Sequence, residues 1–467
     1  MTNQNLESVL LGASKGISHF LYNQQTGPNV YPGVPPEYTN WRDEQRAWQK
    51  TCVLFNQSYH MAELQVEGPD AMKLLSYLGV NSFANFGLDR AKQFVPCSPE
   101  GYVIGDVILF HLAENLFNLV GRIPALNWVR YHAETGGYKV KTELDERTAV
   151  RKDPSRRRHY RFQVQGPNAM KTIERATGAP VPDVKFFHLT WTEIAGKKVR
   201  ALRHGMAGQP GLEFFGPWED GEAVRLALVE AGREFGLRQV GGRAYSANTL
   251  ESGWIPSPLP AIYTSKEMKA YREWLPADCY EAKASIGGSF YSENIEDYYL
   301  TPWDLGYGHI VKFDHDFIGR AALEKMAKRR HRQKVTLALD NEGVTKVLAS
   351  FLQKTGRAKF MEFPSAVYAM HPFDRVLVNG RPAGLSTWIG YSYNEGRMLT
   401  LAMVEEEYSA PGTEVSLVWG EPNGGSAKPT VEPHVQMEIP AIVSPVPYAE
   451  VARELYAPAG WRAHQPA

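Results

Sequence analysis

Two short motifs in this chain carry the residue types of known binding sites. Gly12-Ala13-Ser14-Lys15-Gly16-Ile17 has the glycine spacing of a nucleotide-binding loop, but such a loop follows a buried strand, and only Asn5–Leu11 precedes it. Asp314-His315-Asp316 places three metal-ligating side chains together, but alternating residues of a strand point to opposite faces. We therefore expect no nucleotide at the first motif and a surface turn at the second.

The composition excludes several classes of function. The chain has 467 residues, with 51 basic and 51 acidic side chains, so no global field attracts nucleic acid or anionic lipid. Its three cysteines form no Cys-x-x-Cys pair, which argues against structural zinc and for a reducing compartment. No apolar run approaches the roughly 20 residues that span a bilayer. We predict a soluble, cytoplasmic protein with no signal peptide.

A nine-residue motif occurs twice in the chain. Gln65–Lys73 and Gln163–Lys171 are identical at seven of nine positions, and the other two exchange an acid and its amide. The separation of about a hundred residues is a normal domain size. Each copy predicts a strand, a turn at Gly-Pro and a helix capped by Asp70 or Asn168. Two related units that meet create a shared cleft, where ligands usually bind.

The remaining chain changes character twice. Aromatic residues crowd into Gly253–Tyr307 while Pro256, Pro258 and Pro260 prevent a helix there, so we expect this segment to pack over a site. The C-terminal part is β-rich: it alternates at Val335–Leu339 and Val415–Trp419 and has a hairpin signal at Asn379-Gly380. Between the two repeats, the basic stretch 151–158 predicts a solvated connector.

Several motifs occur in the order found in one known family. They are the two Gly-Pro-[Asp/Asn]-Ala motifs, Pro210–Pro217, Gly242-Arg243, Leu250–Gly253, Asp316–Arg320 and Pro382–Gly384. Together they resemble the aminomethyltransferase family, the folate-binding T-protein of glycine cleavage and its relatives. The resemblance implies an α+β fold with three domains in a cloverleaf: two related α/β units plus a C-terminal β-barrel or sandwich.

The same resemblance implies the boundaries of these parts. We expect residues 1–60 with 155–250 to form the folate-binding α/β unit and residues 61–154 to form the second related unit. Residues 251–330 are then an aromatic and proline-rich connecting segment, and residues 331–467 are the C-terminal β domain. Tetrahydrofolate is the cofactor that the resemblance implies, bound in the central hole.

The sequence departs from the glycine-cleavage enzyme at two places. Gly101–Asp106 keeps only the second acid of the motif Gly-Gly-Ile-x-Asp-Asp, and Arg243–Glu251 rewrites the compact Arg-Asp-[Ser/Thr]-Leu-Arg-x-Glu segment. The finer detail resembles instead the tetrahydrofolate-dependent aryl O-demethylases, which act on syringate and vanillate. The matching stretches include Val30–Pro32, Asn40–Arg42, Tyr59–Met61, Val120–Arg122, Leu202–Gly208 and Asn248–Tyr263.

This resemblance implies a displacement at carbon, with N5 of tetrahydrofolate as nucleophile and a phenolate as leaving group. Alignment of the reactants contributes roughly 7 kcal/mol or more, and a positioned acid adds about 10²–10⁴-fold. Tyr245 matches the position of the catalytic tyrosine. Its reference pKa of about 10 is close to that of a phenol, so proton transfer between them is nearly balanced.

The resemblance also implies the binding residues. Tyr31 and His60 would contact the carboxylate or phenolic hydroxyl of the substrate, and the guanidinium fork of Arg122 suits an aromatic carboxylate.

For tetrahydrofolate, the carboxylate of Glu213 suits the donor edge of the pterin. Gln57 and Gln165 match amide positions that bind folate, and Trp254 can stack on its rings. Gln165 occupies the place that Glu67 has in the first repeat, which fits one ligand bound unequally by two related units.

We therefore predict a methyltransferase that demethylates a methoxylated aromatic acid, with syringate favoured and vanillate or 3-O-methylgallate as alternatives. It would act as a monomer or homodimer, with no nucleic-acid or membrane partner and no metal. Two other hypotheses stay open: an aminomethyltransferase of a glycine-cleavage-type system, and a non-catalytic folate-binding protein.

Overall fold

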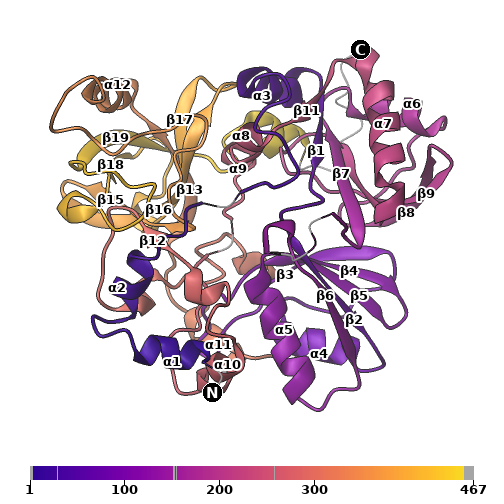
Figure 1. The fold of residues 1–467 in the computed structure, drawn as a ribbon, viewed down its shortest axis with the longest axis horizontal. Helices are drawn as coiled ribbons and strands as arrows, with labels where there is room; N and C mark the ends of the chain where they lie inside the picture. Colours follow the sequence, from indigo (N-terminus) through magenta and orange to yellow (C-terminus); the bar gives the residue numbers. More distant parts are fainter. Residues whose placement is uncertain (1–3, 29, 151–152, 154, 257, 457–467) are drawn as a thin grey trace.

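The structure, a computed structural model, describes residues 4–28, 30–150, 153, 155–256 and 258–456. Its sheets form separate lobes around a common centre, as Figure 1 shows. Two lobes are open sheets with helices on them, and a third is a closed barrel. The predicted α+β class and three-part fold are confirmed, and the C-terminal part is a barrel rather than a sandwich.

The first open sheet has six strands in the order β11-β1-β7-β10-β9-β8. They are β1 (Cys52–Asn56), β7 (His159–Gln165), β8 (Leu189–Ile194), β9 (Lys197–Leu202), β10 (Gly211–Pro217) and β11 (Leu237–Val240). Cys52 and Leu54 face a core shared with two helices, whereas Val53 and Phe55 face the opposite side. The helices are α6 (Ala169–Thr177) and α7 (Gly221–Gly232) on the first side and α3 (Trp41–Lys50) on the second.

The second open sheet has five antiparallel strands in the order β3-β4-β5-β2-β6. They are β2 (Ala62–Glu67), β3 (Arg90–Phe94), β4 (Val107–Ala113), β5 (Leu116–Gly121) and β6 (Lys141–Asp145). Helices α4 (Ala71–Leu78) and α5 (Ile123–Thr135) pack against each other, and α5 packs on the sheet.

The repeated motif has the same backbone role in both sheets. It leads from β2 into α4 and from β7 into α6, as predicted. Gly68 and Gly166 have φ of 141° and 130°, and a Cβ on either would lie 2.3 Å or 2.6 Å from a carbonyl oxygen of a neighbouring segment. Glycine is therefore needed at both turns because only it permits this φ and this close approach.

The predicted helix caps are wrong. Neither Asp70 nor Asn168 makes a capping hydrogen bond to its own helix. Asp70 instead accepts from the backbone N–H of Lys139 at 2.8 Å, and Asn168 donates to the carbonyl of Phe235 at 3.1 Å. Asp70 bonds the segment that approaches Gly68, whereas Asn168 reaches Phe235, which is not the segment that approaches Gly166.

The connecting segment contains short elements and the chain's first two helices pack on it. Its elements include α10 (Lys269–Trp274), β12 (Ile286–Gly287) and α11 (Arg320–Met326). Helix α1 (Leu6–Leu11) packs on α10, and α2 (Ile17–Tyr22) packs on β12. The expected grouping of residues 1–60 with the six-stranded sheet is wrong for α1 and α2, which bury their apolar side chains in a core shared with the connecting segment.

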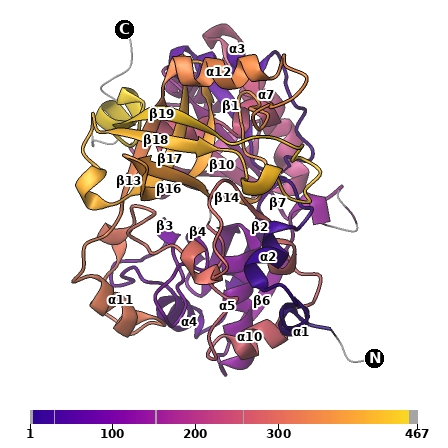
Figure 2. The same ribbon diagram turned by 90° about the vertical axis from the view of Figure 1, so that its left-hand side faces the viewer.

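The barrel closes in the order β13-β17-β16-β15-β18-β19. Its strands are β13 (Gln333–Leu339), β15 (Asp374–Val378), β16 (Arg381–Ser392), β17 (Arg397–Val404), β18 (Glu414–Trp419) and β19 (Met437–Ser444). The predicted hairpin turn at Asn379-Gly380 joins β15 to β16, with φ of 50° and 73° at the two residues. Helix α12 (Asn341–Ser350) packs on β19, near the top of Figure 2, and the two-residue strand β14 (His371–Pro372) pairs with β12.

The predicted solvated connector over 151–158 is wrong at Arg157. Residues 151, 152 and 154 of this stretch lie outside the described residues. The buried guanidinium of Arg157 pairs with Asp145 at 3.0 Å and donates to the carbonyl of Ser58 at 2.8 Å. Arg157 thereby ties the end of β6 to the turn that follows β1, so the two open sheets are held together at this point.

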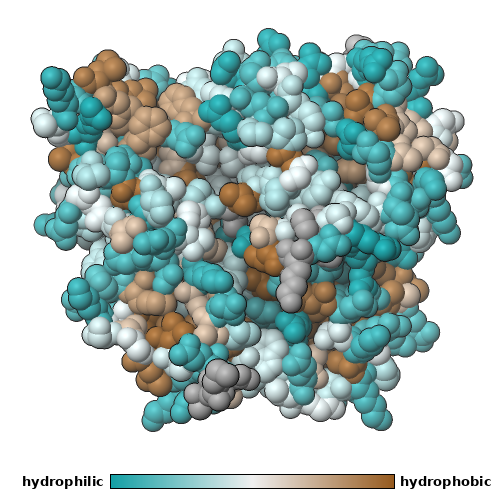
Figure 3. Space-filling view, in the orientation of Figure 1, coloured by the Kyte–Doolittle hydropathy of each residue, from teal (hydrophilic) through white to brown (hydrophobic). Residues whose placement is uncertain are grey.

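One simpler prediction concerns the surface. Asp314 and His315 lie in bends, and the Asp314 side chain is about half exposed, so the predicted surface turn is confirmed. No helix among the described residues is long and apolar enough to cross a membrane. On the face drawn in Figure 3, apolar residues occur in scattered patches between hydrophilic ones.

Candidate active site

A cavity of about 240 Å³ lies where the two open sheets, the connecting segment and the barrel meet. We call it the reaction pocket. Side chains of β4, β5 and β10 line it, together with residues of α8 (Gly242–Tyr245), α9 (Asn248–Ser252) and β16. Seven of the eight predicted site residues line this pocket: Tyr31, Gln57, His60, Arg122, Glu213, Tyr245 and Trp254.

Three rings form one end of the reaction pocket. The ring centroids of Tyr31, His60 and Tyr245 lie 4.7–5.0 Å apart. The hydroxyl of Tyr245 lies 3.2 Å from Nε2 of His60 and 3.4 Å from the sulfur of Met206. The positive charge of Arg122 acts on both Tyr31 and His60, so a guanidinium also lies close to this end.

The protonation states of this end follow from burial. Burial raises the pKa of Tyr245 well above its usual value, and the nearby Tyr31 and Glu213 raise it further. Burial also raises the pKa of Tyr31 to about 12, against the opposing charge of Arg122. For His60, burial and then the charge of Arg157 lower the pKa to about 3. At neutral pH both phenols therefore keep their protons and the imidazole is uncharged.

Local structure explains why these rings meet. The N–H of Gln57 and the side chain of Ser58 both bond the carbonyl of Arg161, so the turn after β1 is fixed and carries His60. On the other side, Gly241 lies against the carbonyl of Pro36, where a Cβ would be only 2.4 Å away. This contact sets the start of α8 beside the segment that carries Tyr31.

Glu213 supplies a buried carboxylate in the same pocket. Burial alone raises its pKa, but a hydrogen bond from His204 and the charge of Arg161 outweigh this and hold the pKa below its usual value. Nη1 of Arg161 donates to Glu213 at 2.9 Å, and its Nε donates to Glu63 at 2.8 Å. The guanidinium is further enclosed by the rings of Phe110 and Phe215, so Glu213 is rigidly held as an anion.

Trp254 lies at the other end of the reaction pocket. Its indole N–H donates to Asp106 at 3.2 Å and to the hydroxyl of Tyr307 at 3.0 Å, and Tyr307 donates to Asp106 at 2.8 Å. Trp254 is 40% exposed although the groups that hold it are buried. The pocket therefore reaches solvent beside Trp254, and a ligand longer than the cavity can extend past it.

The structure separates the two predicted glutamines. Gln57 lines the reaction pocket, and its side-chain N–H contacts Gln163 and the sulfur of Met206. Gln165 does not line it. The oxygen of Gln165 accepts from the N–H of Ala207 at 2.8 Å and its nitrogen donates to the carbonyl of Gln209 at 3.1 Å. Its amide thus holds the loop that covers β7.

Several lining residues were not among the predicted site residues. His204 lies 3.7 Å from Glu213, and Asp106 holds Trp254. Both residues belong to sequence motifs described above, but the motifs assigned no role to either side chain. A usable signal was the alternation of Arg161, Gln163 and Gln165 along β7, because three polar side chains on one face of a buried strand predict a polar layer. Trp388 had no such signal, since only folding brings β16 to the pocket.

The donor and acceptor groups of the pocket fit a ligand with a polar ring edge. Buried polar atoms of lining residues lack a hydrogen-bond partner among the described residues: Oε1 of Gln57, Nδ1 of His60, Oδ1 of Asn248 and Oγ1 of Thr249. Such atoms cost free energy unless a ligand or water pairs with them. The Glu213 carboxylate and the oxygens of Gln57, Asn248 and Thr249 are mostly acceptors, which the N–H groups on the edge of a pterin can fill, so the residues present suit tetrahydrofolate.

Two related sheets and a barrel around a buried pocket with a carboxylate define an aminomethyltransferase-like protein. The profile described as "GCVT N-terminal domain" matches residues 15–257, and the chain belongs to this family. "Syringate O-demethylase" of Sphingobium sp. strain SYK-6 is 63% identical over 459 residues, covering 98% of this chain and 99% of that relative.

More distant relatives share most of the chain. "Sesamin methylene transferase" of Sinomonas sp. strain No.22 is 30% identical over 408 residues, covering 83% of this chain and 86% of its own. Among solved structures, the glycine cleavage system aminomethyltransferase T from Bartonella henselae has a TM-score of 0.60 at 19% identity. That match covers 92% of this chain and 95% of the solved one, and it shows the shared fold.

Proposed function

We propose that this protein is an O-demethylase that transfers the methyl group of a methoxylated aromatic acid, syringate above all, to tetrahydrofolate. The observation that carries the proposal is the hydroxyl of Tyr245 lying 3.2 Å from Nε2 of His60 in a pocket that also holds Glu213. The raised pKa of Tyr245 and the lowered pKa of His60 support it. The relative that is 63% identical over nearly the full length acts, by its name, on syringate.

Tyr245 is the acid for the leaving oxygen. When the methyl–oxygen bond breaks, the aryl oxygen becomes a phenolate and takes the hydroxyl proton of Tyr245. With the Nε2–H tautomer, His60 donates to the tyrosine oxygen, so the tyrosine proton points to the substrate and the developing charge is stabilised. Its unpartnered Nδ1 is then an acceptor for a hydroxyl of the substrate ring.

The other residues of this end bind and orient the aromatic acid. Arg122 pairs with the carboxylate through its guanidinium fork. Tyr31 packs on the ring, and Phe110 and Val120 exclude water from the ether oxygen.

Tetrahydrofolate, when bound, supplies the N5 nucleophile that accepts the methyl group. Glu213 would hold the donor edge of the pterin, with Arg161 fixing the carboxylate, and Gln57 would accept from the ring. Trp254 stands at the exposed end, where it would stack on the part of the coenzyme that leaves the pocket.

The test is a turnover assay with purified protein, tetrahydrofolate and a panel of syringate, vanillate and 3-O-methylgallate. We expect methylated folate and the demethylated phenol to form in equal amounts, with syringate the fastest substrate. Release of ammonia from an aminomethylated carrier protein, without demethylation of any panel member, would overturn the proposal. Binding of folate with no product from any partner would do the same.

A further inference from the structure

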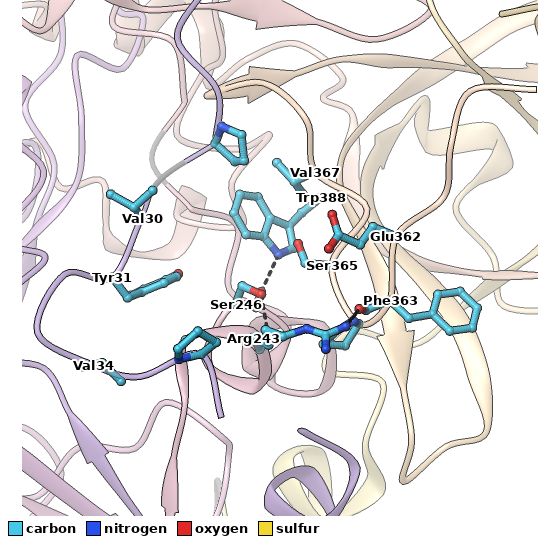
Figure 4. A pocket seen from close by; sticks show the side chains of 14 residues that line it. Val30, Tyr31, Val34, Arg243, Ser246, Glu362, Phe363, Ser365, Val367 and Trp388 are labelled. Atoms are coloured by element: carbon cyan, nitrogen blue, oxygen red, sulfur yellow. Dashed lines mark hydrogen bonds between the residues drawn. The ribbon is translucent and has the colours of Figure 1, made fainter. Parts of the chain in front are cut away.

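A second pocket of about 290 Å³ lies against the reaction pocket. Figure 4 shows the side chains that line it. We call it the outer pocket. One side is formed by the segment Val30–Pro36 and the other by residues 362–367. Three residues line both cavities: Tyr31, Ser246 and Trp388. The outer pocket is thus separated by a few side chains from the reaction pocket.

The three shared residues form the wall between the two cavities, and two of them are fixed by hydrogen bonds. The indole N–H of Trp388 donates to the carbonyl of Ser246 at 3.1 Å, a bond drawn in Figure 4. The hydroxyl of Ser246 donates to the carbonyl of Arg243 at 2.8 Å. Tyr31 differs, because its hydroxyl makes no hydrogen bond to any described residue. The backbone on both sides of Tyr31, residues 23–28 and 30–40, forms neither a helix nor a strand.

The wall borders the three-ring end of the reaction pocket. Tyr31 contacts His60 and Tyr245 on its inner side, while the pocket reaches solvent at the opposite end, beside Trp254. A coenzyme that fills the Trp254 end would block that opening for a second ligand. An aromatic acid bound after the coenzyme therefore needs another path to the three rings.

We propose that the outer pocket is a binding site through which the methoxylated aromatic acid reaches the reaction pocket, and that it passes Tyr31 on the way. The inference rests on the proposed function. The site is small: about 290 Å³ is at the lower limit of ligand pockets, which run to about 1,000 Å³, so it has room for one substituted ring. Rotation of the Tyr31 side chain joins the two cavities.

The residues that line the outer pocket suit the aromatic ring of such a ligand more than they suit its negative charge. Val30, Val34 and Trp388 offer apolar and aromatic surface. Arg243 is the cation of the lining, but it lies 3.4 Å from Glu37, and the carboxylate of Glu362 also lines the pocket. Because one cation faces two carboxylates, the charges give a carboxylate ligand no net attraction, and contact with the aromatic ring must supply it.

The experiment uses a removable obstruction in the outer pocket. Val30 lines the outer pocket but not the reaction pocket. Its side chain is 61% exposed, so the Val30→Cys variant should fold normally. Capping that thiol with a bulky aromatic disulfide reagent fills the cavity, and reduction removes the cap from the same protein. The capped unsubstituted protein, with its three native cysteines, is the first control. Capped Leu11→Cys, exposed on α1 and outside both pockets, is the second.

Stopped-flow tryptophan fluorescence then gives the association rate constant of syringate with protein already saturated with tetrahydrofolate and, separately, that of tetrahydrofolate with the free protein. We expect the cap at position 30 to slow syringate association about tenfold with the equilibrium Kd nearly unchanged, because a path and not the final site is obstructed. Folate association should not change, and reduction should restore the syringate rate. An unchanged syringate rate, or an equal slowing of folate, overturns the inference.

These measurements need no turnover, so the two proposals fail separately. If syringate binds but is not demethylated, the proposed function is wrong and the effect of the cap still decides whether the outer pocket is the path. If no methoxylated aromatic acid binds even at millimolar concentration, both proposals fall. If turnover is normal and the cap has no effect, only the outer-pocket inference is wrong.

Discussion

Replacing Tyr245 with phenylalanine is the most direct test of the proposed chemistry, because it removes one hydroxyl and keeps the ring. The structure gives that hydroxyl two partners, Nε2 of His60 at 3.2 Å and the sulfur of Met206 at 3.4 Å. The ring itself packs edge-on against Phe55 and beside Tyr31. Those packing contacts remain in the Tyr245→Phe variant, so its pocket should keep its shape.

The expected loss of activity is much larger than the expected loss of stability. One ordinary hydrogen bond contributes about 1 kcal/mol to the free energy of unfolding. A positioned acid contributes about 10²–10⁴-fold in rate, which is roughly 3–5 kcal/mol in the activation free energy. We therefore expect kcat to fall at least a hundredfold, whereas Tm should shift by only a few degrees.

The assay compares kcat for a series of methoxybenzoates whose leaving phenols differ in acidity. A more acidic leaving phenol needs its proton less, so the Tyr245→Phe variant should lose least activity on those substrates. Tyr31→Phe is the matched control: it removes the other phenol of the ring cluster, which does not bond His60. A Tyr245→Phe enzyme within about threefold of the parent rate, or a loss independent of the leaving group, would refute the acid role.

Three further predictions concern other residues of the site. Glu213→Gln keeps the shape of the side chain but removes its charge, so calorimetry should show folate binding weakened at least about tenfold; unchanged affinity would remove Glu213 from the folate site. His60 has a pKa of about 3 in the folded protein against about 6.5 when unfolded, so the folded state binds fewer protons and its stability is lost as pH falls below about 6.5. In denaturant titrations, the free energy of unfolding of His60→Gln should fall less steeply with falling pH than that of the parent, by up to about 1.4 kcal/mol per pH unit. An equal pH dependence in the two proteins would contradict this prediction. Gln165→Ala leaves Ala207 and Gln209 without their buried partner, so the free energy of unfolding should fall by about 1–3 kcal/mol. Folate affinity in Gln165→Ala should fall less than in Glu213→Gln; an equal fall would show that Gln165 binds the coenzyme.

Local signals in the sequence were enough to predict the elements that carry the site. The Gly-Pro turns at Gly68 and Gly166 marked the end of a strand and the start of a helix in both sheets. The pair Asn379-Gly380 marked a barrel hairpin because both residues tolerate positive φ. These features depend on a few neighbouring residues, so they can be read without knowledge of the tertiary structure.

The predictions that failed depend on contacts between distant segments. Asp70 looked like a helix cap, but its carboxylate is taken by the N–H of Lys139, which only the folded sheet brings near. The grouping of residues 1–60 with the six-stranded sheet fails for α1, because the backbone N–H of Leu6 donates to the carbonyl of Leu275 in the connecting segment. Trp388 lines the reaction pocket from the barrel for the same reason. Sequence patterns indicate that a side chain is buried, but not against what.

The reaction pocket must keep one buried group charged and another buried group protonated. The residues that hold these two groups show how it does so. Glu213 has to stay charged while buried, and Arg161, itself held by Glu63, gives it a fixed counter-charge. Tyr245 has to stay protonated; burial favours this most by raising the pKa of the phenol, and the negative charge of Glu213 raises that pKa further. The same carboxylate that suits the coenzyme therefore also favours the protonated form of Tyr245. Loss of its charge should affect both functions, coenzyme affinity directly and the proton of Tyr245 through the field.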